Sequence, residues 1–467
     1  MEESMLQLSQ FPVMPFSEFL EALFHALDGE GVRYCFLRNY EGFPAKNVGG
    51  DNDILISPFQ LPSAMRALQS IQGIRIIGYI ERFYSGGVFL EGSSAIPGVR
   101  SLIIDFRVSL SWKGLSYLHA DDVLRASVPR QAGNLNFFVP SPVHEAIDSL
   151  FASLLLAGFL KEKYFPQTQR TFASSRSEVI AALSPQFGLK SATRLVNAVI
   201  DGDRRKILGC VGSLRASLAL RSLLHRPFRS VAAIARHNAY EIADRYLPKT
   251  SETICVFGPD GGVKSKLIEG LMPILESAAK FVQRHHSGPR FLFVDESSGK
   301  APSADFHAQT PSRYFTSMAK VVQWLVEEWL SLFAEKTNLT LRISDRSYAD
   351  LLTDPKGYGY GGPMWFARFA GKLFPSPDLW ILLDPSAEGL QSGNQVVPRA
   401  EKLWQLEAYR AFVKTKKSYI ILDGSKPVAS LMEEAYAAII NTLAQRADAQ
   451  LICRFCTKQG AQRKTEY

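Results

Sequence analysis

ETICVFGPDGGVKSKLIEGL, residues 252–271, decides the fold of the C-terminal half of this chain. A short apolar run rich in β-branched residues reads as a strand, a glycine-rich turn follows it, and a helical segment follows the turn. Gly258, Lys264 and Ser265 occupy the first glycine, the lysine and the serine of the pattern G-x-x-x-x-G-K-[ST]. Val263 stands where that pattern has its last glycine. The stretch therefore predicts a phosphate-binding turn that departs from the pattern at one position.

The chemistry of such a turn comes from its backbone and from two side chains. Successive N–H groups and the N-terminus of the following helix form a cradle for phosphate oxygens. The lysine reaches the β- and γ-phosphates, and the serine hydroxyl is a ligand of Mg²⁺. A β-branched Val263 costs about 1–3 kcal/mol of strain if its position needs a positive φ, which does not by itself exclude binding. The residues expected to contact the nucleotide are Gly258, Asp260, Gly261, Gly262, Lys264 and Ser265.

Apolar strands and helical segments alternate after this turn. This alternation predicts an α/β domain with a doubly wound parallel sheet that helices cover on both faces. A ligand then binds at the carboxyl ends of the strands. The expected strands span 339–345, 377–384 and 418–424, and the expected helices span 313–336, 400–416 and 431–446.

Residues 252 to about 446 resemble the P-loop kinases of the thymidylate-kinase-like type. LRISDRSYADLL, residues 341–352, resembles the strand and DR[YF] motif of those kinases, and PDLWILLD ends in Asp384 where their lid segment begins. The resemblance implies ATP and Mg²⁺ as cofactors. It places Asp345 near the metal and the transferred phosphoryl group, and it places Arg346 on the acceptor phosphate. Arginine suits that role because its planar guanidinium binds phosphate bidentately. Lys264, Asp345 and Arg346 are thus the expected catalytic residues.

A closer likeness is to thymidylate-kinase-like proteins encoded with bacterial surface-polysaccharide genes. DRSYADLLTDPKGYGYGG, residues 345–362, is similar to their motif DR-Y-Y-x-DLLxDPxRYRYGG. Gly357 stands where an arginine is common, Lys266 replaces a threonine, and Ser392-Gly393-Asn394 replaces a basic lid. Losing a lid cation is consequential, because a cation on the transferring group can be worth about 10³-fold or more in rate. Candidates to replace that cation are Arg368, Lys372, Arg399 and Lys402.

A second candidate site lies in FLRNYEGFPAKNVGGDNDILI, residues 36–56. Asp51 and Asp53 are two positions apart, so on one strand they share a face, and Asp105 on a later strand can complete a triad. Three carboxylates around Mg²⁺ suit phosphoryl or nucleotidyl transfer. Residues 30 to about 165 resemble the nucleotidyltransferase superfamily, which implies a metal site at these aspartates. The alternative is ordinary turn chemistry, in which Asp and Asn bond the local backbone.

Composition and length set the domain organisation. A chain of 467 residues is too long for one core, and 46% hydrophobic with 21% charged residues is typical of a soluble globular protein. We expect an α+β nucleotidyltransferase-like domain over 1–140, a helical extension with a basic connector over 141–250, and the kinase-like domain over 251–467. The basic stretch 201–250 suits nucleic acid, anionic lipid headgroups or a phosphorylated substrate, or it is a solvated connector. Nucleic acid is not expected, since aromatic residues do not interleave there as single-strand stacking requires.

The sequence indicates a cytoplasmic protein. Its longest apolar run, residues 150–160, is half of the roughly 20 residues that span a bilayer, so no membrane span is expected. The N-terminus lacks the basic segment of a secretory signal. Five scattered cysteines suit a reducing compartment. Cys453 and Cys456 form one CxxC without a second pair, which favours surface thiols over a zinc site.

The leading functional hypothesis is ATP- and Mg²⁺-dependent phosphoryl transfer to a small acceptor. The acceptor is a nucleotide, or a sugar in a surface-polysaccharide pathway, and the pathway rests on resemblance alone. The alternative is an impaired kinase domain that binds nucleotide or serves as a scaffold, with any chemistry left to Asp51, Asp53 and Asp105. In a third hypothesis both sites are relics and the protein organises partners. A homodimer is left open.

Overall fold

The structure is a computed structural model that divides into two compact units. The C-terminal unit comprises Pro248–Asp448 with Met1–Gln10, and the N-terminal unit comprises Phe11–Leu247 with Ala449–Tyr467. The described residues are 13–45, 52–94, 99–246, 251–258, 263–276, 278–279, 281–285, 314–334, 340–355, 358–385 and 399–456.

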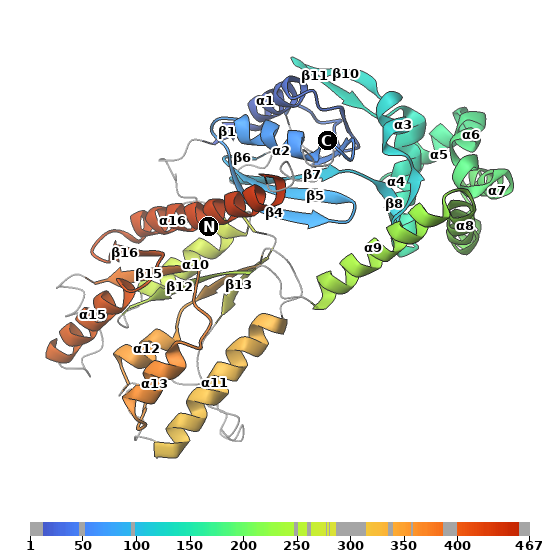
Figure 1. Cartoon of the computed structure of the whole chain (residues 1–467). Helices are drawn as coiled ribbons and strands as arrows, with labels where there is room; N and C mark the ends of the chain where they lie inside the picture. The colour runs from blue at the N-terminus through green and yellow to red at the C-terminus, as the bar shows by residue number, and fades with distance from the viewer. Residues whose placement is uncertain are drawn as a thin grey trace, which may run out of the picture. The chain divides into compact units, whose positions relative to one another are not determined.

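The C-terminal unit is built on a five-stranded sheet (Figure 1). The strand order is β13-β14-β12-β15-β16, and every neighbouring pair is parallel, as the alternating pattern predicted. The central strand β12 is buried on both faces, which explains its continuous apolar run. The strands are β12 (Ser251–Phe257), β13 (Phe281–His285), β14 (Thr340–Ser344), β15 (Leu379–Asp384) and β16 (Tyr419–Asp423).

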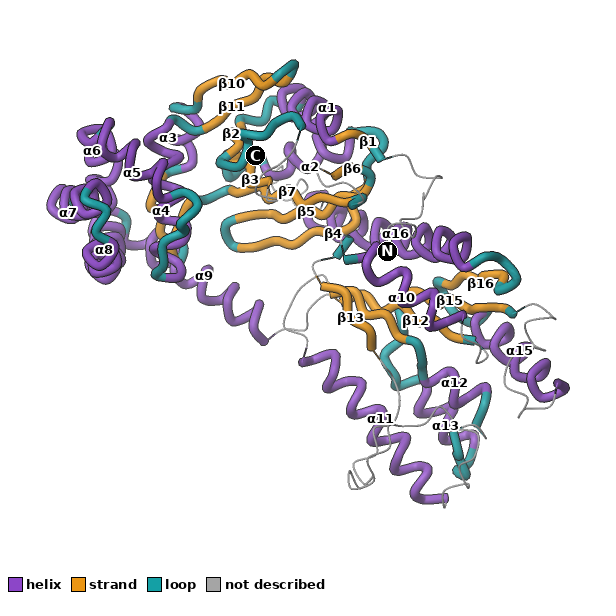
Figure 2. Tube along the Cα trace, turned by 180° about the vertical axis from the view of Figure 1, so that it is seen from behind, coloured by secondary structure: helices purple, strands orange, loops and turns teal. Residues whose placement is uncertain are grey.

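Helices cover both faces of this sheet (Figure 2). On one side α10 packs against α16, where Gly270 approaches Met432. On the other side Cys255 and Phe257 of β12 share a core with Ala349 and Tyr409 of two further helices. The helices of the first face are α10 (Val263–Leu275) and α16 (Val428–Leu451), and those of the second are α11 (Tyr314–Ala334), α12 (Tyr348–Thr353), α13 (Met364–Gly371) and α15 (Arg399–Val413).

The N-terminal unit contains a mixed five-stranded sheet in the order β2-β3-β7-β5-β4. Strands β3 and β7 are parallel, and the other neighbours are antiparallel. Helices α1 (Phe16–Gly29) and α2 (Leu61–Ser70) pack on each other. The sheet strands are β2 (Tyr34–Phe36), β3 (Asn52–Ile56), β4 (Arg75–Arg82), β5 (Ser85–Glu91) and β7 (Ser101–Arg107). Three small pairs accompany them: β1 (Met14–Pro15) with β6 (Ser93–Ser94), β8 (Leu110–Trp112) with β9 (Leu115–Leu118), and β10 (Val128–Ala132) with β11 (Leu135–Val139).

A helical part completes the N-terminal unit and shares its core. Leu55 of β3 and Tyr117 of β9 belong to the same buried cluster as Phe151, Phe187 and Leu214 of the helices, so the helical part is an extension of this unit. The helices are α3 (Ala120–Arg125), α4 (Pro142–Ala157), α5 (Phe165–Ser174), α6 (Arg176–Phe187), α7 (Leu189–Ile200), α8 (Arg204–His225) and α9 (Pro227–Tyr246).

Helix α8 is long and apolar enough to cross a membrane by length and composition, and it is the one such helix among the residues that the structure describes. Ile207, Cys210, Leu214 and Leu218 of this helix are buried in the shared core. A single helix with this packing is a weak indication, so the described chain has no clear membrane span.

Candidate functional site

The phosphate-binding turn predicted at 258–265 begins at a glycine that no other residue can replace without a shift. Gly258 directly follows β12 and has φ of 140°, and a Cβ built on it lies 2.6 Å from the carbonyl oxygen of Leu383. The Lys264 Nζ donates to the Gly258 carbonyl at 2.7 Å, so the lysine reaches back over the turn. Asp260, Gly261 and Gly262, three of the residues expected to contact nucleotide, lie outside the described residues.

Val263 does not have the positive φ that would strain a β-branched residue. It is the first residue of α10, and the described non-glycine residues with positive φ are Asn39 and Lys113. A helical backbone suits valine with only a small loss of side-chain freedom. The departure from the glycine pattern therefore does not strain the backbone at this position. Ser265 lies two residues farther along α10, in its first turn.

The topology of the sheet brings the predicted catalytic residues to one edge. Helix α10 follows β12 on one face of the sheet, and α12 follows β14 on the other, so the crevice between these neighbouring strands opens at their carboxyl ends. The register pairs Cys255 with Ser344. Gly258 and Asp345 thus lie just beyond the ends of adjacent strands, and Lys264 and Arg346 adjoin them.

Asp345 is held by an arginine of the edge strand. The Arg284 Nη2 and Nε donate to the Asp345 Oδ2 at 2.7 and 3.2 Å, and the Asp345 side chain is 14% exposed. The same guanidinium approaches Glu269 of α10 at 3.8 Å. A metal ion bound by Asp345 has to share that carboxylate with Arg284 or displace it.

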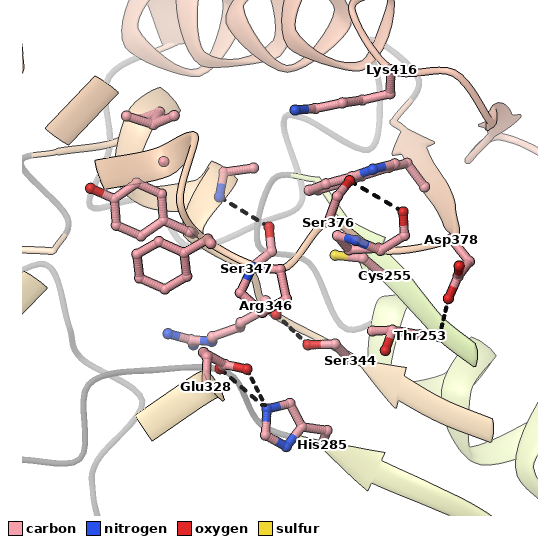
Figure 3. Close-up of a pocket in the computed structure, with 18 of the residues that line it drawn as sticks. Thr253, Cys255, His285, Glu328, Ser344, Arg346, Ser347, Ser376, Asp378 and Lys416 are labelled. Carbon is pink, nitrogen blue, oxygen red and sulfur yellow. Dashed lines mark hydrogen bonds and ion pairs between the residues drawn. The ribbon is translucent and has the colours of Figure 1, made fainter. Parts of the chain in front are cut away.

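Arg346 lines a cavity of about 420 Å³ on the second face of the sheet. Arg346 lies beside the pair formed by His285 and Glu328, and Lys416 lies on the opposite side of the cavity (Figure 3). The His285 Nε2 is 3.2 Å from the Glu328 carboxylate. The cationic lining residues are Arg342, Arg346, Arg368, Lys372 and Lys416, and the aromatic ones are Tyr348, Phe374, Trp380 and Phe412.

Lys416 has an environment that weakens its charged form. Burial lowers the pKa of its ammonium group below the ordinary value. Its Nζ lies 4.1 Å from the ring centre of Phe412 and 5.2 Å from that of Trp380, both of which attract a cation. The sequence does not mark Lys416, Trp380, His285 and Glu328 as site residues, because they form no motif and come together only through the sheet and its covering helices.

A second arginine–carboxylate pair stands at the same edge. Asp384 ends β15, and Arg410 of α15 donates to it from Nε to Oδ2 at 2.9 Å and from Nη2 to Oδ1 at 2.8 Å. The register pairs Leu382 with Phe257, so Asp384 lies level with the start of the turn. Arg410 was not among the cations expected to replace a basic lid, and nothing in its helical surroundings marks it in the sequence.

Two of the four residues expected to replace the lid cation lie at the cavity. Arg368 and Lys372 line the cavity. The side chains of Arg399 and Lys402 lie outside what the structure describes, as do Gly357 and the segment 392–394.

In the N-terminal unit, Asp53 and Asp105 face each other across the parallel strands β3 and β7. The Arg38 Nε donates to the Asp53 Oδ2 at 2.8 Å. Burial raises the pKa of Asp105, with a smaller contribution from the charge of Asp53, while Ser85 and Arg107 partly oppose the rise. Asp51 lies outside the described residues, which contain no group of three or more metal-binding side chains. The structure thus places two of the three predicted carboxylates together, and the metal site stays a prediction.

Comparison with known proteins adds little to this geometry. No family model and no curated protein matches the chain. A thymidylate kinase from Candida albicans is similar at 16% identity with a TM-score of 0.29, covering 42% of this chain and 93% of that one. A deoxyadenosine kinase from M. mycoides is similar at 14% identity with a TM-score of 0.27, covering 41% and 99%. A NadR protein bound to NAD and AMP-PNP is similar at 13% identity with a TM-score of 0.29, covering 47% and 58%. These scores are too low to argue from, so the α/β fold rests on the strand order of the chain itself.

Proposed function

We propose that the C-terminal unit transfers the γ-phosphoryl group of ATP to an oxygen of a small acceptor, releasing ADP. The proposal is supported by the neighbouring parallel strands β12 and β14, whose carboxyl ends lead to Gly258, bonded by Lys264, and to Asp345, with Arg346 lining a cavity of about 420 Å³. Phosphoryl transfer needs little covalent help from a protein and depends on positioning and on charge stabilisation. An edge with these groups supplies both.

Each residue has a defined part in the proposed reaction. Lys264 exchanges its bond with the Gly258 carbonyl for the β- and γ-phosphates, and Ser265 offers its hydroxyl to Mg²⁺. Asp345 and Ser265 would hold Mg²⁺, and Arg346 would bind the acceptor. The bound metal would supply positive charge against the charge that develops on the transferred group.

The cavity favours an acceptor that combines an anionic group with a flat ring. Several cations line it together with Trp380 and Phe412, and its volume falls within the usual range for small-molecule sites. A nucleoside monophosphate fits this chemistry better than an uncharged sugar does. A sugar acceptor in a surface-polysaccharide pathway is the second acceptor in the proposal, and its support is the sequence resemblance.

Arg410 is the proposed source of the charge that the segment 392–394 lacks. The Arg410 guanidinium lies at the carboxyl ends of the strands, where Asp384 binds it. The Arg410 side chain is 44% exposed. The Arg410 guanidinium can exchange the Asp384 carboxylate for a phosphate without a change in the fold, because both groups accept two hydrogen bonds from a guanidinium.

The test is a coupled assay of ADP release with a panel of nucleoside monophosphates and sugars. Lys264→Ala is expected to abolish transfer, while Lys266→Ala, an exposed lysine on the same helix turn, keeps it. Asp53→Ala in the other unit is also expected to keep it. Transfer that survives Lys264→Ala would refute the proposed site.

A second candidate function is nucleotide binding without turnover. The observation that favours it is the ion pair between Asp345 and Arg284, which occupies the carboxylate expected to hold the metal. In that case Mg²⁺-ATP raises the melting temperature of the wild type but not of Lys264→Ala, and no acceptor releases ADP. Any chemistry then falls to a metal site at Asp51, Asp53 and Asp105, or both units serve only to organise partners.

The domain limits and the setting of the protein are part of the proposal. The proposed limits are 1–140 for the nucleotidyltransferase-like domain, 141–250 for the helical extension and 251–467 for the kinase-like domain. The compact units differ from these limits in that Ala449–Tyr467 belongs to the N-terminal unit. The proposed cytoplasmic location is supported by the free thiols of Cys35, Cys210 and Cys255. A homodimer stays open to measurement of the mass in solution.

A further inference from the structure

The N-terminal unit contains a cavity of about 780 Å³ that no predicted motif accounts for. Its walls come from parts of the chain that are distant in sequence. They are the β4–β5 turn, the β7–β8 connection, the start of α3, one face of α9, and the end of the described chain. Cationic and aromatic residues of the lining include Arg82, Phe83, Arg236, Tyr240 and Arg454.

The cavity is built by specific contacts. Gly114 has φ of 81°, and a Cβ there lies 2.6 Å from the carbonyl oxygen of Ala233, so α9 docks on the β8–β9 turn at a position that only glycine allows. The Tyr240 hydroxyl donates to the Glu81 carbonyl at 2.8 Å. These two contacts fix α9 as one wall of the cavity.

The end of the described chain forms another wall. Arg454 pairs with the Glu81 carboxylate, a residue 373 positions earlier in the chain. The ring of Phe455 packs edge-on against Tyr79, with ring centres 5.9 Å apart. Arg454 thus brings the segment Ile452–Cys456 into the cavity lining, and the contact of Phe455 with Tyr79 holds the segment beside it.

The charges in the cavity are unbalanced and in part unused. Arg82 and Arg236 form no hydrogen bond or ion pair with any residue that the structure describes, and Arg236 lies over the Phe83 ring at 5.8 Å. The carboxylates in the lining are Glu81, which Arg454 already neutralises, and Asp121. The charge of Arg82 also acts on Asp105, which does not line the cavity. Two guanidinium groups without a hydrogen bond or ion pair to a described residue therefore line a concave space whose lining has a single carboxylate that no arginine neutralises.

We infer that this cavity binds a small organic phosphate, with phosphate oxygens on Arg82 and Arg236 and the organic part against Phe83 and Tyr240. Guanidinium forks bind phosphate bidentately, and the hydroxyls of Ser109 and Ser116 in the lining add further donors. The volume suits a small molecule rather than a polymer. The site stands apart from the proposed kinase reaction, because every lining residue belongs to the N-terminal unit.

The experiment uses the full chain carrying Lys264→Ala and Arg346→Ala, so that neither the phosphate-binding turn nor the proposed acceptor cavity of the other unit contributes. Isothermal titration with AMP, glucose 1-phosphate and inorganic pyrophosphate is expected to show binding of at least one of the two organic phosphates, and binding of pyrophosphate alone would contradict the inference. The pair Arg82→Gln with Arg236→Gln should weaken that binding at least tenfold. Arg229→Gln, an exposed arginine on α9 outside the lining, is the matched control and should leave it unchanged.

Hydrogen–deuterium exchange places the bound probe. The expected result is protection of peptides covering 79–86 and 230–242 by the probe, lost in the double variant and kept in the control. Circular dichroism and melting temperature establish that the double variant is folded, and Arg82→Lys, which keeps the charge without the fork, should retain part of the affinity. Equal binding by the double variant and its control, or no binding of any probe at millimolar concentration, would overturn the inference.

Discussion

Replacing Gly258 by alanine is the sharpest test of how the phosphate-binding turn is built. The residue has φ of 140°, a region that is essentially reserved for glycine and costs about 1–3 kcal/mol for another residue. The added Cβ would lie 2.6 Å from the Leu383 carbonyl oxygen, which is backbone and cannot rotate away. Moving it disturbs the pairing of β12 and β15, and overpacking of this kind costs about 1–3 kcal/mol. We therefore expect Gly258→Ala to lower the free energy of unfolding by roughly 2–5 kcal/mol.

Gly270→Ala in α10 is the matched control. Its Cβ would meet the Cε and Sδ of Met432 at 2.5 and 2.7 Å, but these atoms end a flexible side chain that can change rotamer. Alanine also gains about 1 kcal/mol over glycine inside a helix. The two effects nearly cancel, so this variant should stay within about 1 kcal/mol of wild type.

Urea unfolding followed by tryptophan fluorescence measures both variants in the relevant unit. Five of the six tryptophans, at 324, 329, 365, 380 and 404, belong to the C-terminal unit, so the signal reports mainly on it. Nucleotide binding is measured on the same samples by the shift of the midpoint, since ligand at 100 times its dissociation constant adds about 2.7 kcal/mol. If Gly258→Ala proves as stable as Gly270→Ala, the close approach of the turn to β15 is wrong.

Three further variants probe other parts of the two units. Arg410→Ala should lower the kcat of phosphoryl transfer by about 10²- to 10³-fold with little change in the acceptor KM, and an unchanged kcat in steady-state kinetics would remove Arg410 from the mechanism. Asp105→Asn should flatten the dependence of melting temperature on pH. In the folded state the pKa of Asp105 lies above the ordinary value of 3.8. The protonated Asp105 carboxyl therefore contributes to stability below pH 3.8, and this contribution is lost as the pH rises through the pKa of the folded state. If the melting temperatures of wild type and variant change by the same amount over the pH range in which Asp105 ionises, the expected loss of stability with rising pH is contradicted. Tyr409→Phe should cost about 1–3 kcal/mol in urea unfolding, because its hydroxyl donates to the buried Asp350 at 2.9 Å, and a cost near zero would mean that Asp350 finds another donor.

The sequence by itself determined the elements of the C-terminal unit and the order in which they occur. Strand, glycine turn and helix at 252–271 follow from local apolar spacing, because a side-chain period of two or of 3.6 is written into consecutive residues. Asp345 and Arg346 at a strand end were identified in the same way, since their motif is contiguous. The parallel sheet followed from the alternation of strands and helices, which forces crossovers.

Only the tertiary structure decided which strands are neighbours and which distant side chains meet. The pairing of β12 with both β14 and β15 sets Gly258 against Leu383, a contact that no local pattern encodes. Arg410 reaches Asp384 from a helix without a motif, and Arg454 reaches Glu81 across most of the chain. Whether Val263 needs a positive φ could not be read from the pattern, and in the folded chain the helix begins at that residue. These cases have one physical reason. Local sequence sets the apolar period and the propensity of a helix or strand. The neighbour of a strand and its register depend on burying whole faces of the sheet, and therefore on residues far apart in the chain.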